Sequence, residues 1–130
     1  MTPTRQELKT YLKRTERFLR DWQTKVPRKL MDLDEWNTYM DTHSSRRLPS
    51  MTRMKDCGAV ACLGGWGEVL YKKYWYGLRR WLGLHVIVWR GDADHLFDIQ
   101  RTELSPYREA TNRLKSRIRQ LKRLLAESER

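Results

Sequence analysis

Two thiols in a short glycine-rich segment are the residues of this sequence best suited to chemistry. Cys57 and Cys62 both lie in the run CGAVACLGGW. Cysteine thiolates bind metal ions, and closely spaced thiols exchange with disulfides. A tetrahedral zinc site would need two further ligands. For these the chain offers three histidines, His43, His85 and His95.

The spacing of the two cysteines favours a structural role. Cys-x4-Cys is unusual for structural zinc, and it is wider than the Cys-x-x-Cys of redox motifs. On a helix, thiols five residues apart also diverge. We therefore expect no metal and no cofactor, and we expect each cysteine to be a small buried residue. This structural motif comprises Cys57, Gly58, Cys62, Gly65 and Trp66.

Nucleophilic catalysis by Cys57 would require a general base, such as His43 or His95, and a group to orient that base. The cluster of Asp92, Asp94 and His95 suggests a cation site, but a helix N-cap explains Asp92 better. We expect no catalytic residues and no enzymatic activity. A thiol- or metal-dependent enzyme stays open as the third alternative.

The chain is strongly basic. Among its 130 residues, 27 Lys and Arg oppose 16 Asp and Glu, which gives a formal net charge of +11 and a pI of about 10.1. Such an excess attracts polyanions over a Debye length or more. Nucleic acid or an acidic or nucleoprotein surface is the expected partner, and the alternative is a generically basic protein. No apolar run approaches the length of a membrane span, so we expect no membrane partner.

The basic residues that we expect to contact a partner fall into two groups. On the last expected helix, Arg108, Lys115, Arg119 and Lys122 follow one another at helical spacing, which places them along one edge. Three arginines are expected to extend this charge around the exposed side: Arg113, Arg117 and Arg123. The remaining candidates precede this helix: Arg46, Arg47, Lys72, Lys73, Arg79 and Arg80.

Aromatic residues are interleaved with the second group of cations. They are Tyr71, Tyr74, Trp75, Tyr76 and Trp81. Aromatic rings among basic side chains suit stacking on nucleic-acid bases. Core packing is the favoured interpretation for these rings, because helical spacing buries at least half of such a set. Stacking stays open as the alternative.

Both ends of the chain predict long helices. Thr4 and Glu7 form a capping-box pattern that opens a helix over about 4–26. Ser105, followed by a proline, opens the basic helix over about 105–128. The heptad-like apolar stripe of this last helix suits either a homodimer or packing on its own domain.

The middle of the chain, about 30–100, predicts shorter elements. The pattern at 85–89 fits a short strand or a buried helical segment equally well. The other expected elements are a helix over about 33–40, a loop over 42–55, a buried glycine-containing helix over about 57–76, a helical turn or two ending near Gly83, and a short helix after Asp92. The whole chain, 1–130, is thus expected to be a single mainly α domain of about four to five helices.

The order of these pieces resembles a group of small, uncharacterised proteins of bacteriophages, prophages and their hosts. The shared pattern includes Cys-Gly-Thr-x-x-Cys-x-x-Gly-Trp, and the resemblance covers roughly residues 30–118. Two departures are Ala59, where the group has threonine, and Gly67, where it has alanine. The matching segments are Asp32–Trp36, Cys57–Trp66, Leu82–Leu84, Leu96–Phe97 and Ala110–Leu114.

The resemblance implies a phage or prophage origin and a single fold, and it implies a mode of action only by analogy. Small accessory phage proteins often bind host machinery, including nucleases and defence complexes. We therefore expect a non-enzymatic accessory protein in the cytoplasm of a bacterial host cell, which binds nucleic acid or a nucleoprotein through basic helical faces. The alternative is an inhibitor that binds a host protein complex, such as a CRISPR-type defence nuclease.

Overall fold

A computed structural model describes residues 2–43, 47–89, 96–97 and 103–129, and every structural statement below concerns these residues. They form a mainly α domain that contains no β-strand, which confirms the expected fold class. Six α-helices occur in them, against the four to five expected. The elements are α1 (Arg5–Lys25), the 3₁₀ turn η1 (Arg28–Leu30), α2 (Thr38–His43), α3 (Met51–Cys57), α4 (Leu63–Tyr71), α5 (Trp75–Trp81) and α6 (Pro106–Ser128).

The helix α1 begins and ends where its sequence predicts. The Thr4 hydroxyl accepts the backbone N–H of Glu7 at 3.1 Å, and the Glu7 carboxylate accepts the N–H of Thr4 at 2.9 Å. This reciprocal pair satisfies two N–H groups that the first turn leaves without a helical partner. At the other end, Val26 is extended before Pro27, because proline disfavours a helical residue in front of it.

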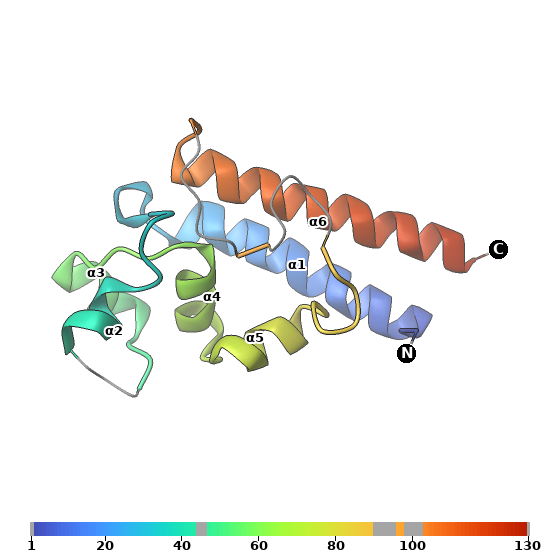
Figure 1. Cartoon of the computed structure of the whole chain (residues 1–130), viewed down its shortest axis with the longest axis horizontal. Coiled ribbons are helices and arrows are strands. Elements are labelled where there is room, and N and C mark those ends of the chain that lie inside the picture. The colour runs from blue at the N-terminus through green and yellow to red at the C-terminus, as the bar shows by residue number, and fades with distance from the viewer. Residues whose placement is uncertain (1, 44–46, 90–95, 98–102, 130) are drawn as a thin grey trace.

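The longest helix, α6, lies antiparallel to α1 (Figure 1). The Ser105 side chain accepts the N–H of Arg108 at 3.3 Å, and proline fills the first helical position, as predicted. An ion pair between Arg5 and Glu129 joins the helices at one end. Near the other end, the Trp22 indole N–H donates to the carbonyl of Tyr107 at 3.4 Å. Within the α6 stripe, Ala110, Leu114 and Leu121 are buried in the chain itself, and Tyr107, Ile118 and Leu125 are partly buried.

The helix expected over 33–40 is shorter and starts later. It is α2, and Asn37 opens it by accepting the backbone N–H groups of Tyr39 and Met40 on its side-chain oxygen. The preceding residues pair with another part of the chain: Met31 and Asn37 each form an isolated β-bridge with Ala61. This tertiary pairing overrides the helical pattern at 33–36.

The loop expected over 42–55 is wrong at both ends, because α2 extends to His43 and the second half contains the start of α3. There α3 begins after Ser50, whose hydroxyl accepts the N–H of Arg53 at 3.1 Å. It ends at Gly58, which has a φ of 67°, a left-handed conformation that glycine adopts readily. The buried helix expected from Cys57 therefore starts only at Leu63, after a short extended connection.

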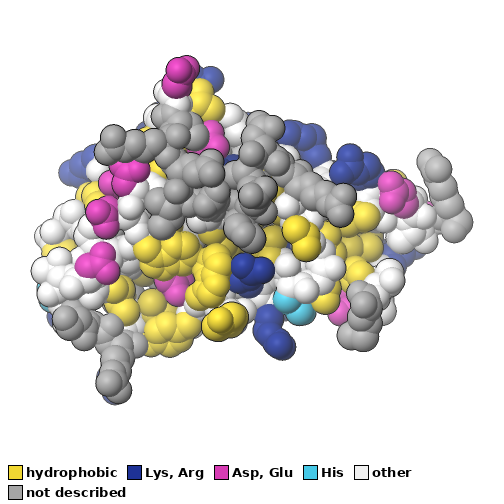
Figure 2. All heavy atoms as spheres, viewed as in Figure 1, with side chains coloured by type: hydrophobic (Ala, Val, Ile, Leu, Met, Phe, Trp, Pro, Cys, Tyr) yellow, Lys and Arg dark blue, Asp and Glu magenta, His cyan; other side chains and the backbone are white. Residues whose placement is uncertain are grey.

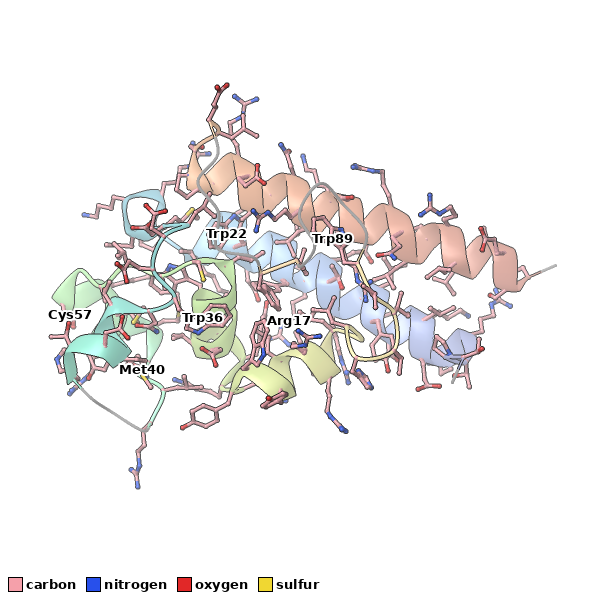
Figure 3. The ribbon with its side chains drawn as sticks, in the orientation of Figure 1. Arg17, Trp22, Trp36, Met40, Cys57 and Trp89 are labelled. Carbon is pink, nitrogen blue, oxygen red and sulfur yellow. The ribbon has the colours of Figure 1, made fainter. Side chains whose placement is uncertain are left out.

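The glycines of α4 admit close neighbours, as their retention in a helix predicted. A Cβ atom on Gly65 would lie 1.8 Å from the carbonyl oxygen of Trp36, and one on Gly64 would lie 2.1 Å from the Trp36 ring. A Cβ on Gly67 would meet the ring of Phe18 at 2.7 Å. Figure 3 shows Trp36 lying against α4, where its indole takes the space beside Gly64 and its carbonyl oxygen the space beside Gly65.

Residues 82–89 are neither strand nor helix. The backbone turns at Gly83, whose φ is 77°, and the N–H groups of Val86 and Ile87 both donate to its carbonyl. Both structures considered for 85–89 are thus wrong. The proposed cap at Asp92 lies outside the described residues, whereas Leu96 and Phe97 are buried in a turn.

Buried residues from α1, α4, α5 and α6 form one main core. Its fully buried members include Phe18, Trp22, Trp66, Leu78 and Leu114. A smaller cluster of Leu8, Tyr11, Ile87 and Leu121 packs beside it. In the described part of the chain, no helix is both long enough and apolar enough to cross a membrane.

Candidate nucleic-acid interface

One face of α6 is lined with cations. Arg108, Lys115, Arg119, Lys122 and Arg123 are all exposed. The opposite face of the helix buries apolar side chains against the core, so the charges project toward solvent. In Figure 2, Lys and Arg side chains gather along the edge of the molecule that α6 forms.

Part of this face borders an open groove between α1 and α6. The α6 side of the groove carries Lys115, Arg119 and Lys122, and the α1 side carries Arg20 and Glu16. The volume of the groove is about 470 Å³. Its other lining residues are Leu19, Gln23 and Ile118. Two long helices thus hold four cationic side chains around one concave surface.

Little negative charge opposes these cations. Between Glu109 and Glu127 the sequence contains no acidic residue, and among the described residues Glu16 is the only carboxylate that lines the groove. Within the described residues, no ion pair involves a groove cation. The pairs found there are Arg5–Glu129, Arg17–Asp21, Lys25–Asp21 and Arg113–Glu109. The groove therefore has a positive potential that favours polyanions.

Two of the arginines expected on the exposed side of α6 lie inside the protein. Arg113 is 4% exposed and Arg117 is 0% exposed, so neither can contact a partner. The sequence contained a signal for Arg117. Its spacing of three from Leu114 and four from Leu121 places it on the apolar stripe. The expectation of an exposed position overlooked this periodicity.

Both buried arginines have partners within the protein. Arg113 pairs with Glu109 at 3.0 Å. Arg117 donates to Gln120 at 2.8 Å and to the carbonyl of Leu82 at 3.4 Å. Arg14, on α1, donates to the neighbouring carbonyl of Trp81 at 3.0 Å. The last carbonyls of a helix lack helical partners and carry partial negative charge, so two guanidinium groups hold the end of α5 between α1 and α6. Burial lowers the pKa of Arg117 to about 10.

Four residues of the second expected group, Lys72, Lys73, Arg79 and Arg80, immediately precede α5 or lie on it. Lys72 is exposed and donates from Nζ to the carbonyl of Pro49 at 2.9 Å. Lys73 and Arg79 are half-buried, and Arg80 is exposed. Arg47 is exposed, and Arg46 lies outside the described residues. In Figure 2, Lys and Arg side chains also appear over α5, apart from those of α6.

The interleaved aromatic residues divide into two sets. Tyr71, Trp75 and Trp81 pack against the core, as the favoured interpretation predicted. Tyr71 also donates its hydroxyl to Asp21 at 2.8 Å, and burial is the main cause that raises its pKa. The other two, Tyr74 and Tyr76, are exposed at 55% and 79% of their surface.

The two thiols differ in environment. Cys62 is 2% exposed, and burial raises its pKa to about 11, as expected for a core residue. Cys57 is exposed at the C-terminal end of α3, so the expectation that it is buried is wrong. The expected helix over 57–76 would have covered Cys57. In the structure, α3 ends at Cys57 and α4 begins only at Leu63. Figure 3 shows Cys57 near one end of the molecule, away from the α1–α6 pair.

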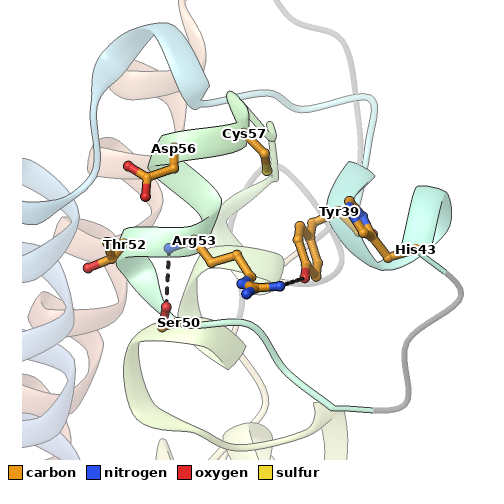
Figure 4. Close-up of a pocket in the computed structure, with 7 residues that line it drawn as sticks. All are labelled: Tyr39, His43, Ser50, Thr52, Arg53, Asp56 and Cys57. Atoms are coloured by element: carbon orange, nitrogen blue, oxygen red, sulfur yellow. Dashed lines mark hydrogen bonds between the residues drawn. The ribbon is translucent and has the colours of Figure 1, made fainter.

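Cys57 and His43 line a common pocket of about 500 Å³, together with Tyr39 and Arg53 (Figure 4). The geometry does not pair the thiol with the imidazole. His43 stacks on the Tyr39 ring at 3.9 Å, and its Nδ1 lies 3.0 Å from the Tyr39 carbonyl. The Cys57 thiol is directed to the carbonyl of Met54 at 3.6 Å. Among the described residues, no group of His, Cys, Asp or Glu is arranged to hold a metal ion.

A buried carboxylate went unnoticed in the sequence. Glu68 on α4 is 7% exposed and accepts the indole N–H of Trp36 and the backbone N–H of Trp75. Burial raises its pKa above the ordinary value, an effect that these two hydrogen bonds partly oppose. Its partners make Glu68 a link between α4, the start of α5 and the 31–37 segment.

The chain matches no protein-family model, and no curated protein or solved structure is significantly similar to it. The resemblance to small phage proteins therefore stays a prediction. The geometry and charge of the described surfaces are the features that bear on function.

Proposed function

We propose that this protein binds nucleic acid through the α1–α6 groove, without enzymatic activity and mostly without reading sequence. The observation that supports this most is the set of four cations, Arg20, Lys115, Arg119 and Lys122, around one open groove. Phosphate groups are the matching ligands, because contacts to phosphates supply most of the affinity in non-specific binding.

The arrangement of the α6 cations suits an extended polyanion. Lys115, Arg119 and Lys122 lie four and three residues apart, and a helix rises about 1.5 Å per residue, so they span roughly 10 Å along one edge. Arg108 and Arg123 extend the same face beyond the groove. A row of unpaired cations along a rigid helix contacts successive phosphates without needing particular bases.

Removal of two groove charges tests this proposal. The double variant Arg119→Gln, Lys122→Gln loses two cations, and its matched control, Lys29→Gln with Lys55→Gln, loses two exposed cations elsewhere. Fluorescence anisotropy with a labelled DNA duplex at low salt measures the affinity of both variants. We expect about tenfold weaker binding for the groove variant and little change for the control. Equal losses in the two variants would contradict a defined binding face.

The alternative of a protein-binding inhibitor makes a different prediction. A shaped protein interface buries apolar and aromatic groups, so its affinity depends less on salt than phosphate binding does. The exposure of Tyr74 and Tyr76 is the observation that favours this alternative. Tight host-protein binding that persists at high salt, with no nucleic-acid binding at low salt, would favour it.

A further inference from the structure

Two tyrosine rings are exposed at and just before the start of α5. Tyr76 is 79% exposed and Tyr74 is 55% exposed, so neither contributes much to the core. The neighbouring rings of Trp75 and Trp81, in contrast, pack inward. A single exposed ring is common on protein surfaces, but two on one short element beside a cluster of cations form a distinct patch.

All the Asp, Glu, Lys and Arg residues in the sequence around this patch are cationic. No acidic residue occurs between Glu68 and Asp92, whereas Lys72, Lys73, Arg79 and Arg80 all fall there. Tyr76 and Arg80 are four residues apart on α5, which places both on one side of the helix. The Arg79 guanidinium lies 5.1 Å from the centroid of the Trp75 ring. Positive charge therefore flanks the exposed tyrosines along the helix.

The surface beside Tyr76 is also open. Gly77 follows it, and a Cβ atom placed there would meet only the Lys73 Cβ, at an ordinary contact distance of 3.7 Å. With no side chain at this exposed position, the ring of Tyr76 is not covered from Gly77. Because Tyr76 is largely exposed, a flat group can approach its ring, and Arg80 lies on the same side of the helix to meet a phosphate.

We propose that the α5 surface, defined by Tyr74, Tyr76, Lys72, Lys73, Arg79 and Arg80, stacks on unpaired bases and gives this protein a preference for single-stranded nucleic acid. The inference rests on the proposed binding of nucleic acid, though not on the groove, and names the class of nucleic acid bound. Unpaired bases expose faces that stack on tyrosine, whereas the bases of a duplex are stacked on one another. An acidic protein or a base-free polyanion would satisfy the cations but leave the rings unused.

Tyr76→Ala and Tyr76→Phe test the stacking directly. Three labelled probes are compared by anisotropy: a single-stranded oligonucleotide, its duplex, and heparin as a base-free polyanion. For Tyr76→Ala we expect about tenfold weaker binding of the single strand, because each stacked base contributes substantially to affinity, and unchanged binding of the other two. Tyr76→Phe keeps the ring and should bind all three like the parent protein. An unchanged single-strand affinity, or an equal loss for heparin, would overturn the proposal.

The failure of this inference is distinguishable from failure of the proposed function. The groove variant Arg119→Gln, Lys122→Gln reports on phosphate binding, and Tyr76→Ala reports on the bases. If only the groove variant weakens binding, nucleic-acid binding stands and single-strand preference is wrong. If only Tyr76→Ala weakens binding, the groove is not the site and the α5 surface is. Because Tyr76 is exposed, its substitution leaves the core intact, and circular dichroism verifies this.

Discussion

At the scale of single residues, the buried carboxylate of Glu68 has a measurable effect on stability. Its pKa is raised in the folded protein, chiefly by burial, so the folded state binds this proton more tightly than the unfolded state does. The contribution of this group to the free energy of unfolding is therefore most favourable at low pH. It declines as pH rises from the ordinary carboxyl pKa through the raised one.

Glu68→Gln should remove the loss of stability that ionisation of the buried Glu68 carboxyl causes as pH rises. Glutamine keeps an oxygen to accept the Trp36 indole N–H and carries no charge to desolvate. We expect the variant to be at least as stable as the parent protein near neutral pH, with the difference shrinking as the solution becomes acidic. Urea unfolding at several pH values measures this. A variant that is less stable near neutrality by a pH-independent amount would contradict the stated cause.

Residue-scale prediction from the sequence succeeded where periodicity was used and failed where it was not. The exposed positions of Lys115, Arg119 and Lys122 follow from their helical spacing, and the structure places them as expected. The burial of Arg117 follows from the same spacing, but charge was taken as a sign of exposure. The exposure of Cys57 depends on α3 ending at Gly58, and a glycine that can end a helix is itself a local signal in the sequence.

At the scale of elements, local signals predicted the two long helices and little else. Capping residues and long apolar stripes act within one segment, so α1 and α6 could be located from the sequence. The start of α2 depends on pairing between the 31–37 segment and Ala61, far along the chain. The turn at 82–89 depends on contacts with α6, including Gln120 donating to the Val88 carbonyl at 2.8 Å. Such non-local pairing leaves no local pattern.

Two glycine-to-alanine substitutions test the element packing in opposite directions. Gly65→Ala would place a Cβ 1.8 Å from the Trp36 carbonyl oxygen, and we expect it to destabilise the fold by about 3 kcal/mol. Gly77→Ala adds a methyl group to an exposed helical position with room for it, and we expect it to stabilise by about 0.5–1 kcal/mol. Chemical denaturation measures the free energy of unfolding of both variants. A tolerated Gly65→Ala would show that α4 does not pack closely on the 31–37 segment.

At the scale of the whole molecule, charge is distributed unevenly. The groove between α1 and α6 carries four cations and one carboxylate, Glu16. The 32–35 segment, in contrast, carries three acidic residues. A polyanion is therefore attracted to particular faces of the molecule, and its binding is oriented as well as strengthened by the field.

Glu16→Gln should strengthen binding. It removes the one carboxylate found in the described lining of the groove and leaves the four cations in place. We expect about two- to fivefold tighter binding of a DNA duplex at low salt, with the gain shrinking as salt screens the charge. Glu127→Gln makes the same change of net charge outside the groove and is the matched control. An equal gain in both variants would indicate an effect of net charge alone.

The salt dependence of duplex binding tests the central claim most directly. If four groove cations contact phosphates, a plot of log affinity against log salt has a slope of about −4, and affinity falls about a hundredfold from roughly 50 to 200 mM salt. In the variant Arg119→Gln, Lys122→Gln the slope should become shallower by about 2. A slope near zero, or the absence of binding at the lowest salt, would show that the groove does not bind nucleic acid.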